Sequence, residues 1–109
     1  RLLDVGADGS LSNRRAFAEV GEHTPDGIAA MPDGSVWFGS PLTGAFVRVA
    51  EDGRILDEVA TTNGRWAVAC ALVDDGRQLA CITADTSIER MPQGDSAAFV
   101  ELLDLADPA

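Results

Sequence analysis

Residues 27–38 read Gly27-Ile28-Ala29-Ala30-Met31-Pro32-Asp33-Gly34-Ser35-Val36-Trp37-Phe38. Two short apolar runs flank the Asp-Gly pair in this stretch. Asp-Gly is typical of a type I′ turn, in which both central residues have positive φ, and Val, Trp and Phe favour strands. The stretch therefore predicts a tight antiparallel hairpin.

Three further Asp-Gly pairs repeat this arrangement, and the four pairs recur every 19 to 25 residues. The further pairs are Asp8-Gly9, Asp52-Gly53 and Asp75-Gly76, and short apolar runs occupy residues 45–49, 54–56 and 79–82. Such a rhythm predicts a chain of antiparallel hairpins, which sandwiches, barrels and propellers all contain. Two turns per repeat give a unit of about 40 to 45 residues, the length of a propeller blade.

Three other segments carry less distinctive patterns. Residues 27–31 and 67–72 are small and apolar on both faces, which is typical of a strand buried on both faces, such as the innermost strand of a blade. Residues 96–105 have a slight local preference for helix, although their length also suits a strand.

Composition limits the classes of function. The chain has 109 residues, 46% of them hydrophobic and 24% charged, which is a globular composition of one-domain length at most. Its net charge of −10 argues against nucleic acids and anionic membranes as partners and suits a protein that holds a divalent cation. No apolar run approaches the length of a transmembrane helix.

The two cysteines and the absence of a visible export signal predict a reducing, cytoplasmic location. Cys70 and Cys81 flank the Asp75-Gly76 turn almost symmetrically, so we expect them to face each other across one hairpin as buried free thiols. We also expect Trp37 and Trp66 to pack between blades.

The order and spacing of several motifs resemble the gluconolactonase-like family, which includes senescence marker protein, gluconolactonase and luciferin-regenerating enzyme. These motifs are Leu11-Ser12-Asn13-Arg14-Arg15, Thr24-Pro25-Asp26-Gly27-Ile28-Ala29, Asp33-Gly34-Ser35-Val36-Trp37, Val47-Arg48-Val49 and Ala69-Cys70-Ala71-Leu72. The last of them is similar to a pattern in bacterial sugar-lactone hydrolases.

The resemblance implies an all-β fold, a six-bladed β-propeller of four-stranded blades. The chain would supply roughly its last two and a half blades: part of one over residues 1–23, a second over 24–62 and part of a third over 63–109. It also implies that residues 96–105 form a strand. The N-terminal blades would lie outside these 109 residues.

The resemblance further implies hydrolysis of a sugar lactone with one divalent metal, Ca²⁺, Zn²⁺ or Mg²⁺, at the propeller axis. Of the family's three ligands only the Asp of the Pro-Asp-Gly segment has a counterpart here, Asp26, which is the expected metal ligand and catalytic residue. A hard cation prefers carboxylate oxygens, so the residue type fits. The alternative is that Asp26 merely fills a Pro-Asp-Gly turn.

Other interpretations remain open. His23, three residues before Asp26, could touch a substrate at the mouth of the axial funnel, or be a solvated loop residue. The chain could also be a non-enzymatic propeller module that binds a ligand or protein, or an inactive fragment, because propellers host many functions.

Overall fold

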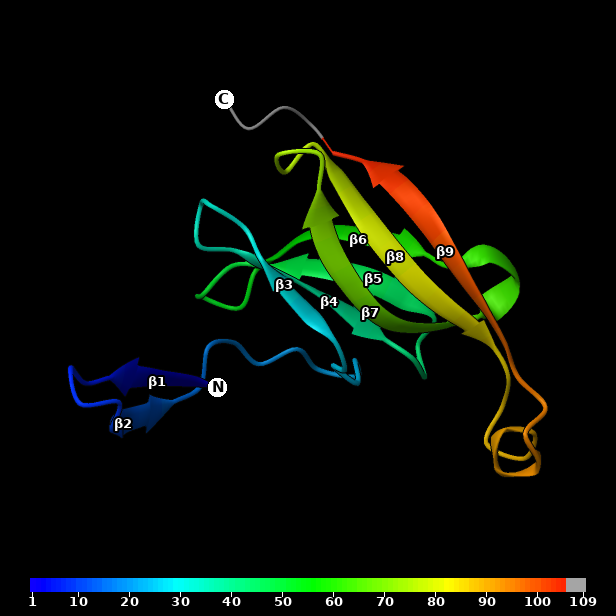
Figure 1. The fold of residues 1–109 in the computed structure, drawn as a ribbon, viewed down its shortest axis with the longest axis horizontal. Coiled ribbons are helices and arrows are strands. Elements are labelled where there is room, and N and C mark those ends of the chain that lie inside the picture. The colour runs from blue at the N-terminus through cyan, green and yellow to red at the C-terminus, as the bar shows by residue number, and fades with distance from the viewer. Residues whose placement is uncertain (106–109) are drawn as a thin grey trace.

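The computed structural model describes residues 1–105 and shows an all-β chain of three antiparallel sheets (Figure 1). The first sheet pairs β1 (Leu2–Val5) with β2 (Leu11–Arg15). The second has the order β3 (Ile28–Ala30), β4 (Val36–Ser40), β5 (Ala45–Val49) and β6 (Ile55–Ala60), and the third has β7 (Trp66–Val73), β8 (Gln78–Asp85) and β9 (Ala97–Asp104).

The predicted hairpins and the all-β class are confirmed over the described residues. The four-stranded sheet lies within residues 24–62, but blade limits and the number of blades in a ring stay predictions. The predicted third unit extends to residue 109, and its last four residues lie outside the described part. Single 3₁₀ turns, Thr62–Gly64 and Met91–Gln93, join strands, and no helix in residues 1–105 is long and apolar enough to cross a bilayer.

The segment at residues 96–105, with its slight helical preference, forms strand β9. It pairs with β8 along its whole length, from Gln78 opposite Asp104 to Asp85 opposite Ala97. The hydrogen bonds of this ladder override the weak local preference. The strand that the resemblance implied is therefore confirmed.

The expected turn type is wrong at three of the four Asp-Gly pairs. Gly34 has φ 89°, but Asp33 is not in the positive-φ region. The Gly34 N–H donates to the Met31 carbonyl at 3.0 Å, and Met31 and Ser35 close the loop through a 2.8 Å backbone bond. This is a three-residue connection with a bulge, which needs positive φ only at glycine. The pairs Asp8-Gly9 and Asp52-Gly53 show the same bonds.

Aspartate has another purpose in these three turns. The Asp33 carboxylate accepts the N–H of Ser35, two residues on, at 2.9 Å, and Asp8 and Asp52 do the same for Ser10 and Arg54. At the fourth pair, Asp75 and Gly76 have φ 54° and 81°, the positive values expected, and Asp74 before them also has positive φ, at 52°.

The second and third sheets pack face to face. The cluster between them consists of Trp37, Phe46, Ala67, Cys70, Leu79 and Cys81. Trp37 thus packs between two sheets, whereas Trp66 is only partly buried and lies outside this cluster. The opposite face of the second sheet buries Phe38, Ala45, Val47 and Val49 beneath Phe17, Ala18 and Val20.

Burial of residues 27–31 on both faces is not observed. Strand β3 is the edge of its sheet, and Ile28 is 65% exposed. β7, the other strand expected to be buried on both faces, is only partly buried. The small apolar residues of these two segments allow β3 and β7 to approach each other closely. They do not indicate that either strand is buried on both faces.

Candidate metal centre

Asp26 lies two residues before β3, at the end of the sheet where β4 finishes. Its backbone N–H donates to the Gly39 carbonyl at 2.9 Å, and the next N–H, of Gly27, donates to the Val68 carbonyl of β7 at 2.9 Å. Trp66, at the start of β7, pairs with Ala84, near the end of β8. These two strand ends lie at the same end of the molecule as Asp26 (Figure 1). The backbone of Asp26 is thus fixed between two sheets.

The Asp26 side chain is exposed. Over residues 1–105, no three His, Cys, Asp or Glu side chains lie together as a metal-binding group. Asp26 is therefore a single outward carboxylate, whose oxygens are available to a hard cation. The donor type fits the implied metal, and a site with three such side chains would need ligands from outside the described residues.

The alternative that His23 is a solvated loop residue is wrong, because the residue is only 9% exposed. Its Nδ1 lies 2.9 Å from the Thr43 hydroxyl, its Nε2 lies 3.4 Å from a Glu58 carboxylate oxygen, and its ring meets Phe38 edge-on. Both ring nitrogens thus face partners within the protein. His23 therefore has no ring nitrogen free for a substrate in this structure.

Ser40 was missed by sequence reasoning, although it holds the segment that leads to Asp26. Its side chain is fully buried, and its hydroxyl oxygen accepts the Thr24 N–H at 2.9 Å and the Thr43 hydroxyl at 2.5 Å. The only sequence signal is a small polar residue at the end of an apolar strand. Ser40 and Thr43 anchor Thr24, two residues before Asp26.

The cysteines are placed as expected. Cys70 and Cys81 are directly opposite each other on β7 and β8, and both are buried and free. Burial raises the pKa of each thiol to about 11, with a smaller contribution from Cys81 on Cys70 and from Glu101 on Cys81. Because the reactive form is the thiolate, these thiols have no place in a catalytic mechanism near neutral pH.

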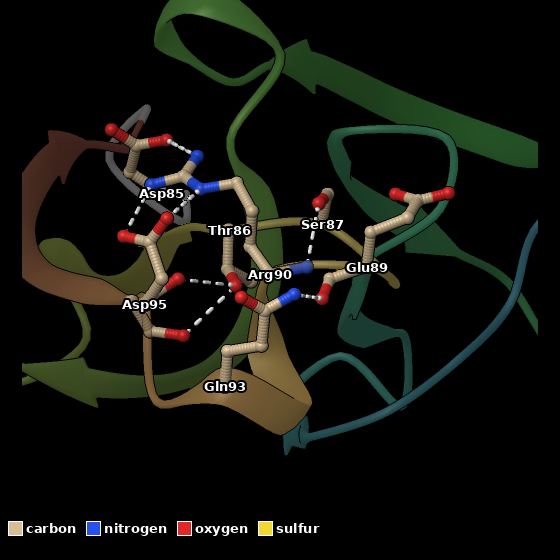
Figure 2. A network of polar contacts seen from close by, with 8 residues as sticks. Asp85, Thr86, Ser87, Glu89, Arg90, Gln93 and Asp95 are labelled. Carbon is tan, nitrogen blue, oxygen red and sulfur yellow. Dashed lines mark hydrogen bonds and ion pairs between the residues drawn. The ribbon is translucent and has the colours of Figure 1, made fainter.

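Two charged networks engage other carboxylates. Arg48 binds Asp33 at 2.6 Å and Asp57 at 2.8 Å. Figure 2 shows Arg90 between Asp85, at 3.0 Å, and Asp95, which it binds through two nitrogens at 2.8 and 3.1 Å. The second network orders the connection between β8 and β9. Because the Arg90 guanidinium already neutralises both of its carboxylates, the network has a structural role rather than a catalytic one.

Comparison with known proteins identifies the family. No curated protein matches the chain. Residues 3–86 match the family described as the SMP-30/Gluconolactonase/LRE-like region. The match runs from the first strand to the end of β8, and includes Asp26, the whole of the second sheet, and strands β7 and β8 of the third. The chain therefore belongs to the SMP-30/gluconolactonase/LRE-like family.

Proposed function

We propose that the protein carrying this chain hydrolyses a sugar lactone, using a divalent cation that is held in part by Asp26. Family membership supports a gluconolactonase-like hydrolase as the class. The antiparallel sheets, packed face to face, are compatible with consecutive blades of a propeller.

The observation that carries the proposal is that Asp26 is exposed although the backbone around it is held in place. Its N–H donates to Gly39 in the second sheet and the next N–H, of Gly27, donates to Val68 in the third, yet Asp26 is exposed. A carboxylate with a fixed backbone and available oxygens suits a cation ligand. The other prominent carboxylate of this sheet, Asp33, instead accepts hydrogen bonds from Ser35 and Arg48.

The proposed chemistry assigns Asp26 two tasks. A bound divalent cation would polarise the lactone carbonyl and lower the pKa of a bound water. Asp26 would help to hold that cation and would accept the proton of the attacking water. The water oxygen bonds to the carbonyl carbon, and the bond from that carbon to the ring oxygen breaks. The proton taken up by Asp26 passes to the ring oxygen, which leaves as a hydroxyl group. The product is the open-chain hydroxy acid.

The test is hydrolysis of gluconolactone by the full-length protein, followed in a pH-stat. Asp26→Asn keeps the side-chain volume and an oxygen but removes the charge, so the rate should fall by about a hundredfold or more. Asp33→Asn is the matched control, because it makes the same change in a second Pro-Asp-Gly triplet. It should leave the rate within about twofold of wild type.

Equal rates for wild type and Asp26→Asn would remove Asp26 from the site. A wild-type protein that binds a divalent cation without hydrolysing gluconolactone or related lactones would favour the binding-module interpretation. In that case the family fold would carry recognition without this reaction.

A further inference from the structure

Strand β7 approaches the Asp26 turn so closely that a backbone hydrogen bond joins the two sheets there. Asp26 donates to the Gly39 carbonyl, Gly39 donates to the Gly27 carbonyl at 3.0 Å, and Gly27 donates to the Val68 carbonyl. The first two bonds tie the turn to the end of β4. The third crosses to the neighbouring sheet, so the position of the turn depends on both sheets.

The Val68 carbonyl is available because β7 is irregular at this residue. The register with β8 shifts between Ala67, which is opposite Thr83, and Ala69, which is opposite Ile82. The shift gives β7 one extra residue, Val68. A bulge of this kind bends a strand and redirects a peptide group, and here the redirected carbonyl accepts the N–H beside Asp26.

Two glycines make this approach possible. A Cβ atom at Gly27 would lie 2.7 Å from the Cα of Ala69, and one at Gly39 would lie 2.7 Å from the carbonyl oxygen of Ala67. The obstructing atoms belong to the β7 backbone, so no rotamer change can relieve the contact. Neither glycine has positive φ. Space, and not backbone conformation, is therefore what requires glycine at both positions.

We infer that Gly27 and Gly39 are positioning residues for the Asp26 carboxylate, because they let β7 clamp its turn through Val68. The inference rests on the proposed function for its metal-binding consequence. A side chain at either glycine separates β7 from the turn and moves the carboxylate relative to ligands contributed from elsewhere. The proposed metal site is thus assembled across the contact of two sheets.

The test uses Gly39→Ala in the full-length protein, since Gly39 itself offers no side chain to a ligand. Calorimetric titration with Ca²⁺, Zn²⁺ and Mg²⁺ identifies the ion that wild type binds most tightly, and that ion is used throughout. We expect its affinity to fall at least about tenfold, the usual consequence of removing support behind a ligand. Without metal, amide exchange at Gly27 should accelerate at least about tenfold, because the bond to Val68 is weakened.

Leu79→Ala is the matched control. Leu79 is fully buried in the same cluster between the sheets, but it lies at the far end, opposite Leu72 and Leu103. The variant should lose stability while retaining wild-type ion affinity. Ala69→Val, which adds bulk beside Gly27, is the second probe should Gly39→Ala fail to fold, and the same loss of affinity is expected.

A folded Gly39→Ala or Ala69→Val protein with wild-type affinity and wild-type exchange at Gly27 would overturn the inference. The proposed function fails separately, through an Asp26→Asn protein that binds the ion as wild type does. In that event the Gly27 exchange rate still decides whether the clamp exists.

Discussion

Two Pro-Asp-Gly triplets lie seven residues apart in one sheet, and they use the same three residue types differently. In residues 32–34 the carboxylate of Asp33 accepts bonds from Ser35 and Arg48, so it is part of the turn. In residues 25–27 Asp26 is exposed, and within residues 1–105 its hydrogen bonding is through the backbone.

The glycines differ in the same way. Gly34 has φ 89° and no atom within 4 Å of the place where a Cβ would be, so it is required for conformation alone. Gly27 has ordinary φ but is pressed against Ala69, so it is required for space. A triplet therefore does not define a role, and the role follows from what the rest of the fold places beside each of its members.

The largest expected difference between the two triplets is in the free energy of unfolding lost when their glycines are replaced. Gly27→Asn places a side chain against the β7 backbone and should cost about 3 kcal/mol of unfolding free energy. Gly34→Asn should cost less than about 1 kcal/mol, because Asn tolerates the left-handed region and open space surrounds the site. Urea denaturation of both variants measures the difference, and equal losses would mean that the two glycines have the same role.

A smaller effect is expected at the residue that follows each triplet. Ser35 is 4% exposed, and its hydroxyl donates to Asp33 at 2.6 Å and accepts from Arg48 at 2.9 Å. Ser35→Ala should therefore cost about 1 kcal/mol. Ile28 holds the corresponding position after Asp26 but is exposed, so Ile28→Ala should stay within about 0.5 kcal/mol of wild type. If Ile28→Ala costs as much as Ser35→Ala, the contrast between the turns is wrong.

The smallest expected effect is a dependence of stability on acid pH. Hydrogen bonds from Ser35 and the nearby Arg48 lower the pKa of Asp33 from 3.8 to about 2. Because the pKa is lower in the folded state, the unfolded chain binds the proton first, and the stabilisation is present above pH 3.8 and is lost as pH falls towards 2. Melting temperatures between pH 5 and pH 2, at buffer points chosen to bracket this range, should fall less steeply for Asp33→Asn than for wild type. Identical slopes would contradict the role of Asp33.

Sequence reasoning located the hairpins because Asp-Gly pairs and short apolar runs are local signals. It assigned the wrong turn type because the preference for Asp has two causes, tolerance of positive φ and acceptance of an N–H two residues on, and the second prevails at Asp33. Strand β9 required the resemblance, because its pairing with β8 is a tertiary interaction that overrides propensity.

The candidate site was only partly predictable. Asp26 could be selected by resemblance, but the clamp from β7 depends on contacts between residues more than 40 positions apart, such as Gly27 and Val68. The burial of His23 likewise depends on Thr43 and Glu58, which belong to other strands and loops of the sheet. No local pattern encodes these partners.

The central claim is that Asp26 is available to a metal and Asp33 is not. It is tested most directly by calorimetric titration of Asp26→Asn and Asp33→Asn in the full-length protein, with the divalent ion that wild type prefers and with melting temperatures measured without metal. We predict that Asp26→Asn loses most of the ion affinity with little change in melting temperature. Asp33→Asn should keep the affinity and melt at a lower temperature. The reverse pattern, or equal ion affinities in the two variants, would contradict the account.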